Sequence, residues 1–169
     1  ALNYAIDRKS MIQLLKFGVG TPANAGFIPK GLPSFEPKKT RGYDYNPEKA
    51  KRLLNEAGYT NKKDFPELVI HTNKDYVDLI TYVAKQWEEI GIPVQIELAE
   101  TATLREKMRL SEYQIFRASW IADYPDEESF LTVFYSKNPA PPNYTRFKNK
   151  LFDDLYETAI QETNELKRI

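Results

Sequence analysis

One stretch of the sequence, Arg-Ala-Ser-Trp-Ile-Ala-Asp-Tyr-Pro-Asp at 117–126, gathers side chains that are suited to binding a charged ligand. The apolar run at 115–121 predicts a strand that the proline breaks. Asp123 would then stand at the tip of this strand, with Trp120 beside it and Arg117 behind it. A carboxylate held in this way is placed to receive a cationic group.

Each of these side chains also has a purely structural interpretation. Asp123 suits a cap for the turn at 124–126, because aspartate favours such positions. Trp120 suits the core for most of its ring. Arg117 suits the surface or an ion pair with a nearby acid. The spacing alone leaves both interpretations of each residue open.

His71 is the only histidine, and the chain has no cysteine. A single histidine without a carboxylate cluster makes a poor metal site, and general-base catalysis needs a partner in reach. A hydrolase that uses Asp123 with His71 is the enzyme alternative, and it requires the two side chains within hydrogen-bond reach. We expect no metal and no cofactor.

Composition limits the classes of partner. The 169 residues include 24 basic and 24 acidic side chains in mixed order, so no basic stripe predicts nucleic-acid binding. No apolar run approaches the length of a membrane span. The sequence also lacks the Gly-rich phosphate loops and the Gly-x-Ser-x-Gly elbow that mark several enzyme classes.

The first part of the chain predicts two helices and a long loop. Asp7 is a good N-cap for a helix that reaches Gly18. Residues 20–45 are rich in Pro and Gly and predict an irregular excursion. The sequence Asn-Pro-Glu at 46–48 then opens a helix that ends at Gly58.

The middle of the chain alternates between strand and helix patterns. Strands are expected at 68–72, 94–98 and 115–121, with helices at 76–90 and 101–110 between them. This order predicts an α/β fold with a right-handed, parallel βαβαβ unit. Ligands bind beyond the carboxyl ends of such strands, here residues 71–73, 99–101 and 122–124.

After the sheet, a short helix is expected at 127–135, a Pro- and Asn-rich loop at 136–145, and a final helix with apolar positions up to Leu166. Residues 1–6 are typical of the end of a helix whose start is missing. We therefore expect the chain to be a piece of a longer protein.

Several motifs in one order resemble a known family. They are Ala-Ile-Asp-Arg at 5–8, Thr-Pro-Ala-Asn at 21–24 followed by Ile-Pro-x-Gly at 28–31, the run Tyr-Asn-Pro-Glu-Lys-Ala-Lys-Arg-Leu-Leu-Asn-Glu-Ala-Gly-Tyr at 45–59, and Trp-x-Ala-Asp-Tyr-Pro-Asp at 120–126. Together they are similar to the bacterial extracellular solute-binding proteins of the oligopeptide and dipeptide class, family 5, which feed ABC importers.

The resemblance implies a periplasmic-binding-protein-like lobe with flanking helices and long Pro-rich loops. Residues 1–169 would form the C-terminal ligand-binding lobe of a two-lobed protein, without the N-terminal lobe. Such proteins close on an extended peptide and are not enzymes. The implied partners are the peptide and the membrane permease subunits of the importer, and the implied location is the periplasm or a lipoprotein at the cell surface.

The resemblance also implies roles for site residues. Asp123 would pair with the peptide's α-ammonium group, and Ile121 would offer backbone groups. Arg117 would help to bind the peptide carboxylate, with Arg109 as a second arginine. Ala122, Tyr124 and Trp120 complete the expected ligand-binding set. The same protein could instead bind haem, a nickel complex or an oligosaccharide stacked on Trp120, Tyr124 and Tyr144.

Overall fold

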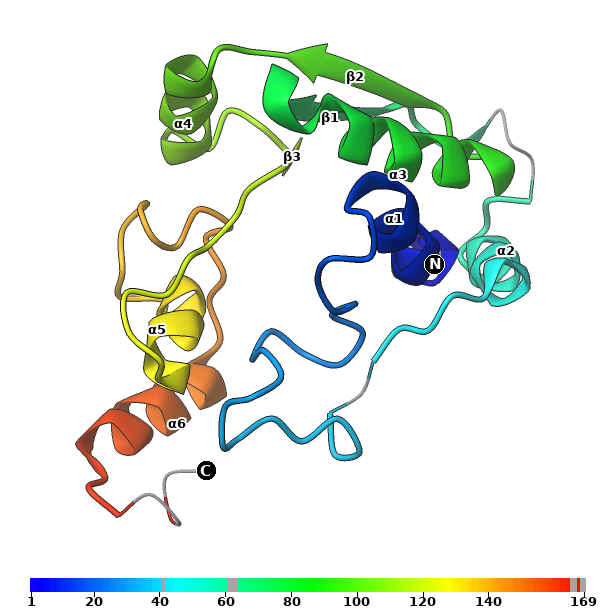
Figure 1. Ribbon diagram of the computed structural model, residues 1–169. Coiled ribbons are helices and arrows are strands. Elements are labelled where there is room, and N and C mark those ends of the chain that lie inside the picture. Colours follow the sequence, from blue (N-terminus) through cyan, green and yellow to red (C-terminus); the bar gives the residue numbers. More distant parts are fainter. Residues whose placement is uncertain (41, 61–63, 165–166, 168–169) are drawn as a thin grey trace.

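The fold is seen in a computed structural model, which describes residues 1–40, 42–60, 64–164 and 167. A small sheet with its helices forms one part, and two C-terminal helices form a second part below it (Figure 1). A single extended stretch of chain leads from the sheet to the second part, and the loop between α1 and α2 descends alongside the second part (Figure 1). None of the described helices is long and apolar enough to cross a membrane.

The sheet has three parallel strands in the order β2-β1-β3. Strand β1 (Leu68–Thr72) lies in the centre, between β2 (Val94–Leu98) and β3 (Ile115–Phe116). Ile70 is paired with Ile96 on one side and with Ile115 on the other. The expected α/β fold with a parallel βαβαβ unit is therefore confirmed.

Helix α3 (Val77–Glu89) connects β1 to β2 and packs on both strands. Its apolar face meets α1 (Arg8–Leu15) and the N-terminal 3₁₀ turn η1 (Leu2–Ala5), which in turn packs on α2 (Pro47–Glu56). These elements share one core, whose buried members are Tyr4, Ala5, Ala50, Leu54, Ile70, Ile80, Trp87, Ile90 and Ile92. Packing in this core holds the sheet in position, and the sheet in turn sets where the carboxyl ends of its strands lie.

Strand β3 is much shorter than the expected strand at 115–121, which is wrong beyond Phe116. The backbone N–H of Arg117 still donates to the carbonyl of His71 at 2.9 Å. His71 is the partner of Phe116, and the central strand β1 ends at the next residue, Thr72. Residues 118–121 therefore have no neighbouring strand to pair with. They leave the sheet as a free stretch.

The C-terminal part contains α5 (Glu127–Leu131), a 3₁₀ turn η4 (Thr132–Phe134) and α6 (Lys150–Gln161). The helix expected at 127–135 is thus a short α-helix that tightens into a 3₁₀ turn. The last helix ends at Gln161, and the expected continuation to Leu166 lies outside the described residues. Edge contacts among the Phe134, Phe147 and Phe152 rings hold α6 against the turn.

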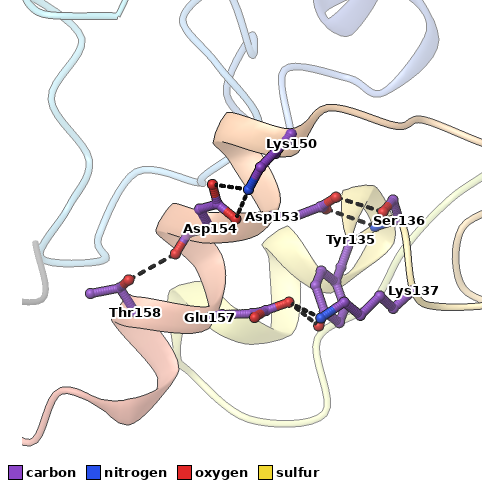
Figure 2. Close-up of polar contacts among 8 residues, drawn as sticks. All are labelled: Tyr135, Ser136, Lys137, Lys150, Asp153, Asp154, Glu157 and Thr158. Carbon is purple, nitrogen blue, oxygen red and sulfur yellow. Dashed lines mark hydrogen bonds and ion pairs between the residues drawn. The ribbon is translucent and has the colours of Figure 1, made fainter.

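Polar contacts also fasten α6 to residues 135–137, as Figure 2 shows. The carboxylate of Asp153 accepts hydrogen bonds from the backbone N–H and the hydroxyl of Ser136. The Glu157 carboxylate accepts from the Tyr135 hydroxyl and the Lys137 ammonium group. The α6 helix therefore docks through both an aromatic cluster and two carboxylates.

The Pro- and Gly-rich excursion at 20–45 forms no helix or regular strand among its described residues, as expected. It is nevertheless attached to the C-terminal part. The ring of Phe27 meets that of Phe134 edge-on with centroids 4.9 Å apart. The backbone N–H of Ser34 donates to the Glu127 carboxylate at 2.9 Å. The excursion therefore packs on α5 and η4 through the Phe27 ring and the Ser34 backbone.

Candidate functional site

The carboxyl ends of the three strands meet, as a parallel sheet requires. The N–H of Ala99, after β2, donates to the Thr72 carbonyl at 2.9 Å. The Asn73 side chain donates to the hydroxyl of Thr101, the first residue of α4 (Thr101–Arg109), also at 2.9 Å. The ends expected at 71–73 and 99–101 are thus brought together. At the end of the third strand the structure has Arg117, and not residues 122–124, beside them.

A pocket of about 370 Å³ opens at this edge, which we call the polar pocket. Asn73 is 7% exposed, and its Oδ1 atom has no hydrogen-bond partner within the described part of the chain. A buried acceptor is costly until a donor reaches it. The polar pocket therefore offers a place for a donor group of a ligand or a water. The lining includes Asn73, Asp75, Tyr76, Arg105, Arg117 and Trp120.

Arg117 is held by an aromatic ring. The centre of its guanidinium lies 3.1 Å from the centroid of the Tyr76 ring, and one nitrogen donates to the Ser119 hydroxyl at 3.4 Å. No carboxylate of the described residues forms an ion pair with it. A guanidinium stacked in this way is oriented while it keeps donors for an anionic ligand group.

Arg109 does not line the polar pocket. Its guanidinium forms a two-fold contact with the Glu106 carboxylate, at 2.8 and 2.6 Å. These hydrogen bonds raise the pKa of Arg109 and lower that of Glu106. Arg105, one turn earlier on α4, lines the pocket and has no ion-pair partner among the described residues. Glu106 lies three residues before Arg109 on the same helix, and this spacing is the sequence signal for their ion pair.

Residues 118–122 form a stretch of exposed and half-buried residues that we call the free segment. None of their backbone N–H or carbonyl groups forms a hydrogen bond within the described part of the chain. Figure 1 shows the segment running from β3 to α5. Ile121 in its middle is 85% exposed. Unpaired backbone groups in a row form a template for pairing with an extended chain.

The far end of the free segment is fastened to α5 by Ser129. The indole N–H of Trp120 donates to the Ser129 carbonyl at 2.6 Å, and the Asp123 N–H donates to the Ser129 hydroxyl at 3.1 Å. Asp126, not Asp123, caps the helix, since its carboxylate accepts from the Glu128 N–H at 2.8 Å. The Tyr124 hydroxyl is hydrogen-bonded to the Glu128 carboxylate.

The Asp123 carboxylate itself is exposed and has no partner in the described part of the chain. The alternative of a satisfied turn cap therefore fails for Asp123 and applies to Asp126. An unpaired carboxylate at the end of an unpaired backbone stretch is free to take an ammonium group.

His71 lies elsewhere. Its ring stacks on Tyr113 with centroids 3.6 Å apart, and its Nδ1 atom lies 3.4 Å from the Glu97 carboxylate. Burial lowers the pKa of His71, against an opposing effect of Glu97. No contact joins His71 to Asp123, so the hydrolase pair is not formed. Among the described residues, no group of three or more potential metal ligands lies together.

Comparison with known proteins decides the family. The model of the bacterial extracellular solute-binding proteins, family 5 (middle region), matches residues 1–142. The chain belongs to this family. Family 5 proteins bind solutes and are not enzymes, which confirms that expectation for this chain.

Two curated relatives of this family 5 chain carry different names. Heme-binding protein A of Haemophilus influenzae is 33% identical over 99% of this chain and 31% of its own length. Oligopeptide-binding protein OppA of Bacillus subtilis is 30% identical over 99% of this chain and 32% of its own length. The chain thus spans about a third of the length of these relatives.

A solved structure is similar over nearly the same extent. The periplasmic, ABC transporter-associated binding protein DppA of Helicobacter pylori, in complex with the peptide STSA, matches with a TM-score of 0.87 at 26% identity. The match covers 99% of this chain and 33% of that protein. The arrangement of elements in this chain is therefore that of a solute-binding protein.

Proposed function

We propose that residues 1–169 are the C-terminal ligand-binding lobe of a two-lobed protein, which captures a short peptide and delivers it to an ABC importer. One observation carries this proposal. Within the described residues, the backbone groups of the free segment 118–122 have no hydrogen-bond partner, and neither has the carboxylate of Asp123 at its end.

The free segment suits the main chain of a peptide. An extended peptide that pairs with residues 118–122 would be bound through groups that every peptide has, whatever its side chains. Its amino terminus would lie at Asp123. A desolvated ammonium–carboxylate pair then selects a free N-terminus, because removing one partner of such a pair costs roughly 3–5 kcal/mol.

The other end of the peptide would lie toward the polar pocket. Arg117 is oriented on Tyr76 and has no ion pair among the described residues. Its guanidinium suits a carboxylate, together with that of Arg105, which also lines the pocket and has no ion pair with any residue that the structure describes. In this proposal Ile121 and Ala122 contribute backbone groups, while Trp120 and Tyr124 flank the ligand and Arg109 contributes nothing directly.

The relatives support the setting. One is named as an oligopeptide-binding protein, and the H. pylori structure holds a peptide and is described as periplasmic and associated with an ABC transporter. We propose the same extracytoplasmic location for the protein that carries this chain, with permease subunits as its partners. A second lobe would close over the free segment.

The decisive experiment is calorimetric titration of the two-lobed protein with a tripeptide and its N-acetylated form. We expect acetylation to weaken binding at least about 100-fold, in keeping with the loss of a buried ion pair. Asp123→Asn should weaken binding of the free peptide to a similar degree. Equal affinity for the two peptides would overturn the role of Asp123.

The matched control is Asp154→Asn. Asp154 is a surface carboxylate that pairs with Lys150 on α6, far along the chain from the free segment. The same change of charge at this position should leave peptide affinity unaltered. A loss of affinity in both variants would point to net charge and not to a specific pair.

A second candidate ligand is haem, because the relative with 33% identity is named as a haem-binding protein. Haem has no α-ammonium group, so Asp123→Asn would not weaken its binding. Titration of the two-lobed protein with haem, followed by visible absorbance, separates the two ligands. Strong haem binding without peptide binding would replace the peptide proposal.

A further inference from the structure

A second pocket, which we call the apolar pocket, lies beside the free segment. Its volume is about 160 Å³. It shares Ala118, Ser119 and Trp120 with the free segment, so one of its walls is the stretch that would pair with a peptide. The remaining wall is almost wholly apolar and includes Phe27, Phe116, Val133, Phe134 and Tyr144.

The walls come from four separate parts of the chain. Phe116 ends β3, Val133 and Phe134 belong to the 3₁₀ turn after α5, and Tyr144 lies in the loop before α6. Phe27 comes from the Pro-rich excursion and packs edge-on against Phe134. No periodic sequence pattern joins these residues, and only the fold brings them together.

The pocket is built from fixed side chains. Trp120 is held by its hydrogen bond to the Ser129 carbonyl. Phe134 contacts the rings of Phe147 and Phe152 as well as Phe27. The loop that bears Tyr144 is tied by Asn143, which is 2% exposed and bonds to the backbone of Tyr135 and of Phe147. A pocket with such walls is largely pre-formed, which reduces the entropic cost of binding.

The size of the apolar pocket suits one apolar side chain. A cavity of about 150 Å³ lined by aliphatic and aromatic residues holds a benzene molecule in another protein. Burial of one aromatic or branched side chain provides roughly 1.5–3 kcal/mol, equivalent to about tenfold or more in affinity. An extended ligand on the free segment would lie next to this pocket, because residues 118–120 form one of its walls.

We propose that the apolar pocket is a specificity subsite, which selects a peptide with a phenylalanine- or leucine-sized side chain at one fixed position. The inference rests on the proposed function, since it takes a peptide as the ligand. It adds a preference that main-chain pairing and the Asp123 carboxylate do not impose. The polar pocket, with its two arginines, differs in character and would take the polar part of the ligand.

The test is calorimetric titration of the two-lobed protein with Ala-Ala-Ala and its three single-phenylalanine variants. We expect one of the three positions to bind about tenfold tighter than trialanine or better. The matching peptide with glutamine at that position should show no gain. If all phenylalanine peptides bind no tighter than trialanine, the subsite is overturned while the peptide proposal stands. If none of the peptides binds, both fall.

Val133→Phe tests the position of the subsite. Val133 is half-buried in the wall, and a ring at this position would occupy the space. The variant should lose the gain for the favoured phenylalanine peptide but keep its affinity for trialanine. The matched control is Val19→Phe, at a side chain that is 78% exposed and lies outside the pocket. Retention of the full gain in Val133→Phe, with the trialanine affinity of the wild type, would overturn the assignment.

Discussion

The Ser129 hydroxyl accepts a hydrogen bond from the backbone N–H of Asp123 at 3.1 Å. Ser129 is 3% exposed and is the one buried residue of α5, so the position of Asp123 is set by a buried side chain of this helix and not by the strand before it. The Ser129 carbonyl also holds the Trp120 indole. One serine therefore sets the geometry of the far end of the free segment.

Ser129→Ala should lower both stability and ligand affinity. The Asp123 N–H loses its partner, which costs about 1 kcal/mol in the free energy of unfolding. The carboxylate is then less well placed, and we expect peptide affinity to fall about fivefold. Ser136→Ala is the control, because it removes the hydroxyl that bonds to Asp153, away from the site. A similar loss of affinity in both variants would contradict a positioning role for Ser129.

Tyr76 should govern the orientation of Arg117. Tyr76→Phe keeps a ring under the guanidinium and should leave peptide affinity nearly unchanged. Tyr76→Ala removes the ring, and a cation–π contact of this kind contributes about 0.5–1 kcal/mol at exposed sites. We expect a three- to fivefold loss of affinity for peptides with a free carboxylate and little loss for C-terminally amidated peptides. Equal losses for both peptides would indicate a general disturbance of the polar pocket.

His71 should make stability fall on mild acidification. Burial lowers its pKa in the folded state, so the unfolded chain takes up the proton at a higher pH. Protonation then favours unfolding as the pH falls through about 6.5, the ordinary range of histidine. Urea unfolding at pH 7.5, 6.5 and 5.5 measures this. His71→Asn should have a smaller loss between these values, and an identical loss would rule out His71 as the cause.

Two carboxylates should make the docking of α6 sensitive to stronger acid. Hydrogen bonds from Ser136 lower the pKa of Asp153, and hydrogen bonds from Lys137 and Tyr135 lower that of Glu157. Their contribution is complete above about pH 4.5 and is lost as the pH falls further, through the depressed values. Thermal unfolding between pH 5 and pH 2.5 should reveal the loss. The double variant Asp153→Asn, Glu157→Gln should be less stable at pH 7 and should change less with acid.

Much of the fold was predictable because its local signals agree with its tertiary contacts. The Asn-Pro-Glu start of α2 and the apolar face of α3 placed those helices within one or two residues of their observed bounds. The length of strand β3 was not predictable, because a strand extends only as far as its neighbouring strand offers partners. Residues 117–121 are apolar enough for a strand, but β1 ends at Thr72 and offers no further partner.

The site was predictable only where one stretch of sequence holds it. Trp120, Asp123 and Arg117 lie in one motif, and the structure places Trp120 within the free segment and the other two at its ends. Arg109 was expected to bind a carboxylate because it is an arginine, but it forms an ion pair with Glu106 on the same helix face. Phe27 and Tyr76 were missed, because each reaches the site from a distant element through packing that no sequence spacing reports.

The free segment has a consequence for the protein when no ligand is bound. Its N–H and carbonyl groups have no partner in the part of the chain that the structure describes, and Ile121 in its middle is 85% exposed, so the segment resembles the open edge of a sheet, to which another chain can add a strand. Its charged ends, Arg117 and Asp123, disfavour a partner of the wrong polarity or register. If a peptide pairs with this segment, as we propose, it covers the same backbone groups that a second protein chain would use, so a bound peptide would also reduce self-association.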